Sequence, residues 1–200
     1  MRVLLLFAFL VLINACAITS VSKKAVHPSS DTLLQQHLNS IANIHQFTMQ
    51  GRIGVQTEGK GFSGGINWQH QPLTDTITLY SPLGSQVALI HKTAGSVVFN
   101  DAKGNSISAA DVETLTQNAL GWVLPLAGLV DWSLGRPAAG PVQNSKEDEK
   151  GHLTTLIQDG WNIEYNNYAN IKDIFLPKKI FLKSEKVNLK LIVENWTINP

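Results

Sequence analysis

Residues Phe47–Gln56 read FTMQGRIGVQ, and the spacing of their apolar side chains decides the fold. Large apolar residues fall on one set of alternate positions, at Phe47, Met49, Ile53 and Val55. Side chains of an extended chain point alternately to opposite faces, so this period of two is typical of a strand with one buried face. The stretch therefore predicts a β-strand that contributes one apolar face to a sheet.

The same period continues toward the C-terminus. Four further runs alternate in this way, and they contain Phe62, Ile66 and Trp68, then Ile77 and Leu79, then Val87 and Leu89, and then Val97 and Phe99. After a mixed-charge loop at 145–150, the pattern predicts strands at 152–158, 161–168, 175–184 and 187–198. We therefore expect a mostly β domain, a meander of antiparallel strands with one apolar face.

A few helices are predicted around these strands. They cover residues 32–44 after an Asp31 N-cap, residues 109–120 between a capping box of Ser108 and Asp111 and a stop at Gly121, and a third segment from Pro125 to a stop at Gly135. A one-sided sheet must bury its apolar face or close on itself, and these helices are available to cover it. Periodicity leaves open whether the interior is filled or holds a cavity.

The first residues indicate export and a lipid anchor. Residues 3–13 form an unbroken apolar run that is short for a membrane span and typical of a signal-peptide core. Ile13, Ala15 and Cys16 then resemble the bacterial lipobox, in which the cysteine becomes acylated. The alternative is an anchor helix with a buried cysteine. We predict a lipoprotein signal peptide at 1–15, a flexible tether at 16–30 from lipidated Cys16, and a single domain at 31–200.

Charge and composition exclude several classes of function. Removal of residues 1–15 leaves fifteen basic and fifteen acidic residues, which argues against general affinity for nucleic acid or strongly anionic surfaces. No nucleophile elbow, phosphate-binding loop or metal-ligand spacing is present, so we expect a protein that is not an enzyme and needs no metal or cofactor. A lysine cluster stands apart and fits either a solvated face or a face toward lipid headgroups: Lys178, Lys179, Lys183, Lys186 and Lys190.

Several short motifs, taken in order, resemble the LolB family of outer-membrane lipoprotein receptors. They are the lipobox, Gly51 in the first strand, Trp68-Gln69 in the second, Pro82-Leu83-Gly84 after the third, the segment Pro125-Leu126, Leu129, Trp132, Gly135 and Pro137, and final strands ending near Trp196. The resemblance covers about residues 33–198. It implies an unclosed antiparallel β-barrel with a helical lid over an apolar cavity.

The resemblance also implies a function. Such a receptor takes acylated lipoproteins from a periplasmic carrier, LolA, and inserts them into the inner leaflet of the outer membrane without nucleotide hydrolysis. It implies a protein that is lipid-anchored at the periplasmic face of the outer membrane, and we expect a monomer. Two alternatives stay open: a structural or assembly lipoprotein with a filled core and no acyl ligand, and an envelope hydrolase with an unfamiliar site.

Site residues follow from the same resemblance. Ser81-Pro82-Leu83-Gly84 suits a type I turn but places a leucine at a position where polar residues are usual. The resemblance implies that Leu83 contacts the membrane and promotes release, whereas the alternative is that Leu83 folds back over the barrel end. The predicted acyl cavity is lined by Phe47, Ile53, Ile66, Trp68, Leu79 and Leu89, with Leu126, Leu129 and Trp132 as its lid.

Overall fold

The computed structural model describes residues 30–198, which contain three helices and eleven strands. The helices are α1 (Ser30–Ile41), α2 (Val112–Leu120) and α3 (Leu126–Ser133). The strands are β1 (Phe47–Gln56), β2 (Gly61–Gln71), β3 (Thr74–Tyr80), β4 (Gln86–Lys92), β5 (Val97–Asp101), β6 (Ser106–Ala109), β7 (Val142–Glu147), β8 (Leu153–Gln158), β9 (Trp161–Ile171), β10 (Ile174–Lys183) and β11 (Asn188–Ile198).

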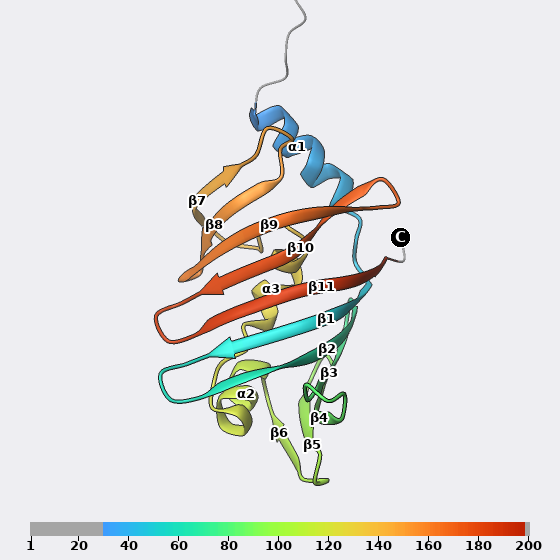
Figure 1. Ribbon diagram of the computed structural model, residues 1–200, viewed down its shortest axis with the longest axis vertical. Coiled ribbons are helices and arrows are strands. Elements are labelled where there is room, and N and C mark those ends of the chain that lie inside the picture. Colours follow the sequence, from blue (N-terminus) through green and yellow to red (C-terminus); the bar gives the residue numbers. More distant parts are fainter. Residues whose placement is uncertain (1–29, 199–200) are drawn as a thin grey trace, which may run out of the picture.

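All eleven strands form one antiparallel sheet that does not close. Its order is β6-β5-β4-β3-β2-β1-β11-β10-β9-β8-β7, so every neighbour is also a neighbour in sequence except the central pair β1 and β11 (Figure 1). That pair runs from Phe47 opposite Ile198 to Gln56 opposite Asn188. The expectation of a mostly β, unclosed antiparallel sheet is confirmed.

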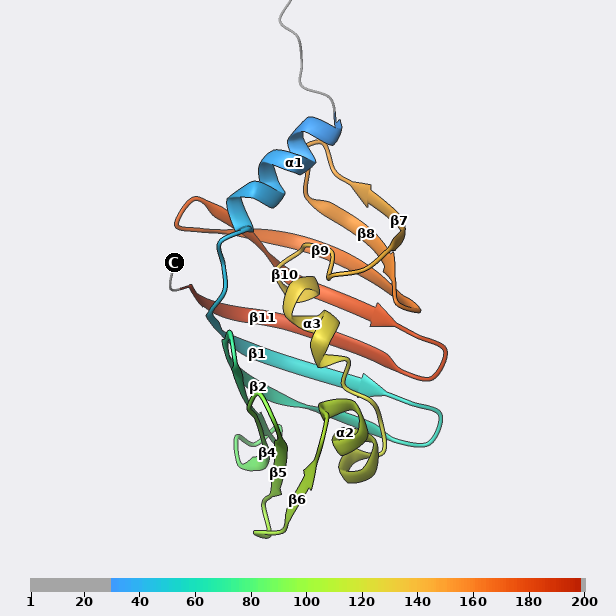
Figure 2. The ribbon, with the colours of Figure 1, turned by 180° about the vertical axis from the view of Figure 1, so that it is seen from behind.

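One face of the sheet, called the inner face below, carries the core. Helices α2 and α3 lie over it, and the opposite, outer face has no helix across it (Figures 1 and 2). The apolar side chains of β11 share the inner face as predicted: Val187 just before the strand, then Leu189, Leu191 and Val193 are all buried. All five tryptophans are buried as well. Burial of this continuous apolar surface is the main stabilising contribution to the sheet.

Helix α1 is fastened to the sheet by an aromatic cluster, the α1 clasp, made of His37, His152 and Tyr168. The His37 ring meets the His152 ring edge-on at 4.8 Å, and His152 stacks on Tyr168 at 4.6 Å. Tyr168 Oη donates to the Leu153 carbonyl at 2.8 Å, and Asp148 Oδ2 lies 3.1 Å from His152 Nδ1. His37 Nε2 is buried without a hydrogen-bond partner. Burial and then the neighbouring His152 lower the pKa of His37 to about 4, against the opposing charge of Asp148.

Three predicted helix boundaries are wrong: both ends of α1, predicted at 32–44 and found at Ser30–Ile41, and the start of α2. Helix α1 begins at Ser30, so Asp31 lies in its first turn, where its charge favours the helix dipole, rather than at the N-cap. Asp111 is itself the N-cap of α2, since its Oδ1 accepts from Thr114 N at 2.7 Å. Ser108 therefore belongs to β6 and forms no capping box. Gly121, with φ of 81°, ends α2 as predicted.

The assignment of Leu89 to the apolar face is also wrong. In β4 the buried side chains are Ala88 and Ile90, while Leu89 points to the outer face opposite Thr78. Residues 87–90 are all apolar, so the sequence does not reveal which alternate set is buried. A register shift between Leu79 and Tyr80 decides it.

The loop predicted at 145–150 is wrong in its first half, because residues 145–147 belong to strand β7. Nearly all of its side chains are exposed at the sheet edge, so no apolar alternation marks it.

Candidate functional site

The turn between β3 and β4 presents Leu83 to solvent. Gly84 N donates to the Ser81 carbonyl at 2.9 Å, and Ser81 N donates to the Ser85 carbonyl at 2.7 Å. Ser85 N also donates to Ser81 Oγ at 3.2 Å, and Gly84 adopts φ of +87°. Leu83 is 96% exposed. The predicted turn is confirmed, and the alternative in which Leu83 folds back over the sheet is wrong.

The base of this hairpin packs tightly against β2. A Cβ added at Gly64 would overlap the Tyr80 carbonyl oxygen, and one at Gly65 would lie 3.3 Å from Tyr80 Cβ. The Gly64-Gly65 pair therefore allows β3 to lie close to β2 just before the turn. The tip is held by backbone hydrogen bonds and the base by this contact, so the hairpin offers Leu83 on a fixed support.

An apolar pocket opens beside the base of the same hairpin, between α2 and the sheet. It has a volume of about 510 Å³ and is lined by Val55, Lys60, Gly61, Phe62, Leu79, Val87, Ala88, Ala119, Leu120 and Trp122. This volume lies within the range of about 300–1,000 Å³ that is typical of pockets for small ligands. Lys60 supplies the only charged side chain of that lining, and its Nζ would lie 2.8 Å from a Cβ placed at Gly121.

The predicted cavity residues are distributed between this pocket and the core. Leu79 lines the pocket. The other inner-face residues, Phe47, Ile53, Ile66 and Trp68, are at most 5% exposed, and so are Leu126, Leu129 and Trp132 of α3. Trp132 Nε1 donates to Gln158 Oε1 at 2.9 Å, which fixes α3 onto the inner face. Leu89 lies on the other side of the sheet.

Sequence reasoning missed most of the pocket lining. Val55 and Phe62 were placed on the apolar face but were not assigned to a cavity, and Trp122 follows the helix-ending Gly121. Ala119 and Leu120 carried no signal beyond helical propensity, because only the tertiary placement of α2 brings them over the sheet.

Asp75 is a buried charge that the sequence did not reveal. It is 1% exposed on the inner face and accepts from Trp68 Nε1 at 2.9 Å, with His70 Nδ1 at 2.7 Å and Lys92 Nζ at 3.3 Å. Burial by itself would raise the pKa of Asp75, but the hydrogen bonds from His70 and Trp68 and the charges of His70 and Lys92 outweigh it and lower that pKa. With every one of these partners in place, the carboxylate orients Trp68 in the core.

Two classes of feature are missing from residues 30–198. No group of three or more His, Cys, Asp or Glu side chains in this range could hold a metal ion. None of its helices is long and apolar enough to cross a bilayer. Cys16, predicted as the lipidation site, and the predicted signal peptide lie outside the described residues.

Comparisons with known proteins agree on one family. A family model described as outer membrane lipoprotein LolB matches residues 45–196. Outer-membrane lipoprotein LolB of Pseudomonas syringae pathovar syringae is 30% identical over 198 residues, 98% of this chain and 96% of that protein. The protein of the same name from Thiobacillus denitrificans is 37% identical over 158 residues, 77% of this chain and 81% of that protein.

A solved structure shares the fold. A LolA superfamily protein from Nitrosomonas europaea superposes with a TM-score of 0.52 at 8% identity, covering 86% of this chain and 94% of that one. At this identity the likeness concerns the fold alone, whereas the sequence matches extend over nearly the whole domain. The chain therefore belongs to the LolB family of outer-membrane lipoproteins.

Proposed function

We propose that the protein accepts acylated lipoproteins from the periplasmic carrier LolA and releases them into the inner leaflet of the outer membrane. The observation that carries this proposal is Leu83, an apolar side chain that is 96% exposed on a hairpin with a fixed backbone. The apolar pocket at the base of that hairpin supplies a place for an acyl chain close to Leu83, where we propose that the chain leaves for the membrane. Cys16 serves as the lipid anchor.

The free energy of hydrating acyl chains explains why such a protein needs an apolar pocket and a contact with the membrane. Three acyl chains hold on the order of 45 methylenes, each worth about 0.8 kcal/mol when it is buried. Exposure of the chains to water on the way across the periplasm would cost tens of kcal/mol. A pocket avoids that cost, and the bilayer provides the final gain. Transfer then runs downhill and involves no covalent step, so neither a nucleotide nor a nucleophile is required.

The pocket residues suggest a division of roles. Leu79, Phe62 and Trp122 line the fixed sheet side and the start of the interhelical loop, while Ala119 and Leu120 come from α2. We propose that α2 is the part of the lid that moves when a chain enters, and that the buried residues of α3 support it from the core.

A pocket-filling variant tests the proposal. Ala119→Phe puts a ring into the pocket, whereas Ala102→Phe adds the same ring at an exposed turn. The mature chain is incubated with carrier that holds a lipoprotein, and cargo acceptance is measured by co-purification. A fluorescent fatty acid reports pocket occupancy in parallel. We expect Ala119→Phe to lose both signals and Ala102→Phe to keep them. If the wild-type chain takes up neither cargo nor probe, the alternative of a structural lipoprotein with a filled core is correct.

A further inference from the structure

The central strands of the sheet carry an excess of positive charge. Strands β10, β11, β1 and β2 together contain five cationic side chains and one carboxylate, Glu194; the cations are Arg52, Lys178, Lys179, Lys183 and Lys190. A mature chain without net charge therefore has a locally basic surface, because all of its acids except Glu194 lie outside these four strands. This local asymmetry is absent from the overall composition.

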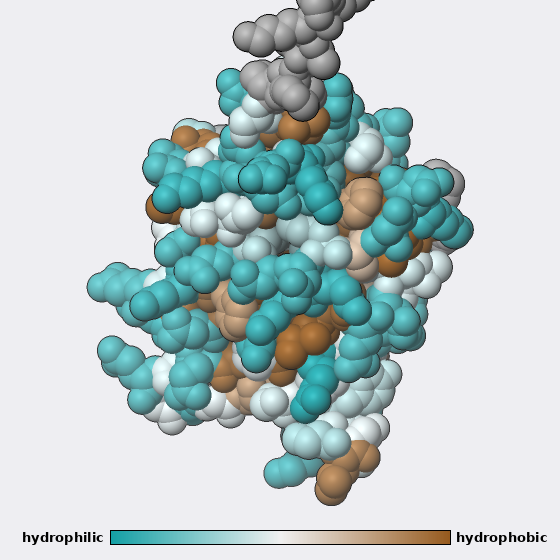
Figure 3. Space-filling view, turned by 45° about the horizontal axis from the view of Figure 1, so that its top comes forward, coloured by the Kyte–Doolittle hydropathy of each residue, from teal (hydrophilic) through white to brown (hydrophobic). Residues whose placement is uncertain are grey.

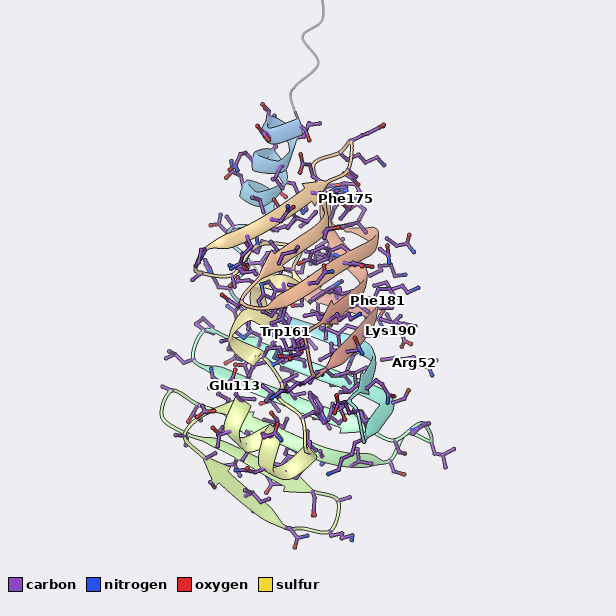
Figure 4. All side chains as sticks on the ribbon, turned by 90° about the vertical axis from the view of Figure 1, so that its left-hand side faces the viewer. Arg52, Glu113, Trp161, Phe175, Phe181 and Lys190 are labelled. Atoms are coloured by element: carbon purple, nitrogen blue, oxygen red, sulfur yellow. The ribbon has the colours of Figure 1, made fainter. Side chains whose placement is uncertain are left out.

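Strand register brings three of these cations together on the outer face. Lys179 of β10 lies opposite Ile192 of β11, which lies opposite Arg52 of β1. One row further, Phe181 lies opposite Lys190, which lies opposite Gly54. Figure 4 shows Phe181, Lys190 and Arg52 on one side of the sheet, away from Trp161 and Glu113.

The same rows combine the cations with apolar surface. Lys179 Nζ and Lys190 Nζ lie 5.0 and 5.5 Å from the Phe181 ring centroid, within the range of cation–π attraction. Gly54 and Gly65 add no side chains, so the face is low between the long cationic side chains. The surface seen obliquely over this side mixes hydrophilic side chains with small apolar patches (Figure 3). We call Arg52, Lys179, Lys190 and Phe181 the outer basic patch.

The outer basic patch is continuous with the Leu83 turn. An open groove of about 590 Å³ is lined by Arg52 and Gly65 and also by Ser81, Pro82 and Gly84, the three residues around the exposed leucine. A second groove of about 540 Å³ on the same face is lined by Gly54, Phe181 and Lys190. Both grooves share Ser63, so they meet. A surface that touches Leu83 can therefore touch Arg52 and Lys190 as well.

The cations of the patch have no ion-pair partners within the described part of the chain. The ion pairs found in residues 30–198 join Asp75, Asp131 and Asp148 to His70, Lys92, Arg136 and His152, none of which belongs to the patch. Glu194 lines the groove with Arg52, and Glu164 lines the one with Lys190, yet neither forms a salt bridge to them. Phosphates of an anionic bilayer surface complement such a patch in charge, and Leu83 beside it complements the hydrocarbon beneath.

We propose that the outer basic patch binds anionic phospholipid headgroups, so that the outer face of the sheet lies along the membrane while Leu83 enters it. This inference rests on the proposed membrane role of Leu83 and adds the headgroup class and the orientation. A cationic side chain near such a surface contributes about fivefold to binding, so loss of two should lower it by roughly thirtyfold.

Vesicle binding of the unacylated mature chain, residues 16–200 with Cys16→Ser, tests the proposal. The test variant carries Arg52→Gln and Lys190→Gln, and the matched control carries Lys146→Gln and Lys150→Gln at the β7–β8 hairpin, with the same change of charge. Phosphatidylcholine vesicles with and without phosphatidylglycerol are the probes. We expect a roughly thirtyfold loss on the anionic vesicles for the test variant alone, no difference on neutral vesicles, and weaker wild-type binding at raised salt.

Several results would overturn the proposal. Equal losses in the two variants would mean that net charge, and not the patch, governs binding. Unchanged anionic binding in the test variant would remove the patch altogether. If that variant bound vesicles normally but accepted cargo from the carrier poorly, the patch would dock a protein instead of lipid. The assay uses no cargo, so it is independent of the proposed function: a wild type that transfers lipoprotein yet ignores phosphatidylglycerol refutes this inference alone.

Discussion

Leu83 is a side chain whose burial energy is not used in the folded protein. Removal of a leucine side chain from water is worth about 1.5–3 kcal/mol, and at 96% exposure almost none of that is gained. The turn around it is held by backbone hydrogen bonds that any residue at position 83 can keep. Function and folding are therefore separable at this one residue.

We predict that Leu83→Glu changes the free energy of unfolding by less than about 0.5 kcal/mol, the usual range for surface substitutions. A glutamate that must enter hydrocarbon costs several kcal/mol, so cargo should be accepted from the carrier but not released into liposomes. Leu73→Glu is the matched control, since Leu73 is 67% exposed at the tip of the β2–β3 hairpin. Flotation of cargo with liposomes measures release, and normal flotation with Leu83→Glu would contradict a role for this leucine.

At the same scale, the sequence predicted some residues and not others. The order Ser-Pro-Leu-Gly predicts the turn locally, but the exposure of Leu83 was predicted only by adding the family resemblance, because the four residues alone also allow the leucine to fold back. Asp75 lies on the same alternate positions as Ile77 and Leu79, and its buried carboxylate is satisfied by Trp68 and His70 of the preceding strand and by Lys92 of the next one. Trp68 and His70 lie within seven residues of Asp75, but the period of two does not show that their side chains converge on a carboxylate, so the buried charge was not predicted.

Among the elements, β1 contains two glycines in unlike surroundings. A Cβ at Gly51 would overlap the carbonyl oxygen of Ile192 in β11, next to the register shift of that pair. A Cβ at Gly54 would meet nothing closer than Lys190 Cβ at 4.0 Å. The first glycine allows the central strands to approach, whereas the second leaves the outer face low.

We therefore predict opposite outcomes for two alanine substitutions in one strand. Gly51→Ala forces backbone shifts and should destabilise the fold by about 1–3 kcal/mol. Gly54→Ala should be neutral or slightly stabilising, because it lowers the entropy of the unfolded chain without a clash. Chemical denaturation of both variants measures the difference, and similar midpoints would show that β1 and β11 can separate at Gly51 without cost.

The α1 clasp makes helix docking sensitive to pH. The pKa of His37 falls from 6.5 in the unfolded chain to about 4 in the fold, so the folded state binds fewer protons. The free energy of α1 docking is therefore largest above pH 6.5 and decreases progressively as the pH falls toward 4. The other titratable groups that face it are His152, Asp148 and Tyr168.

We predict that the stability of α1 docking drops between pH 6.5 and 4, by at most about 3 kcal/mol. His37→Phe keeps ring contacts to His152 and Tyr168 but removes the proton, so its stability should change less over this interval. His45→Gln, an exposed histidine, serves as control. Hydrogen exchange of the α1 amides measures docking, and an equal pH response of wild type and His37→Phe would assign the effect to other groups.

The sequence predicts a strand correctly where apolar and polar residues alternate. It fails where a strand is apolar on both faces or exposed on both. β11 alternates from Asn188 to Val193, before its bulge, and was placed within a residue of its bounds. The four apolar residues 87–90 hide their register, and the exposed β7 carries no apolar face. The pocket could not be predicted from the sequence either, because it forms only where α2 packs against the sheet and no local pattern shows that contact.

For the whole molecule, the first and last described elements differ in how much the sheet depends on them. Strand β11 lies between β1 and β10 at the centre of the sheet, while α1 packs at one end of it (Figure 1). We predict that a chain ending at residue 186 shows no cooperative unfolding transition, because two central strands lose their partner. A chain that starts at residue 45 lacks α1 and should still unfold cooperatively, at a lower temperature. Thermal melts followed by circular dichroism decide it; a cooperative melt without β11 would show that the two halves of the sheet fold separately.

The pairing of β1 with β11 also sets a minimum time before the sheet can fold. Roughly 130 residues separate the end of β1 from the start of β11, and ribosomes add about 5–20 residues per second. Strand β1 therefore stays without this partner for on the order of ten seconds, because β11 is the last of the described strands to be synthesised. The central pair of strands cannot form while synthesis is under way. The nascent polypeptide therefore stays unfolded at the centre of its sheet during the interval in which an exported protein passes through a translocation channel.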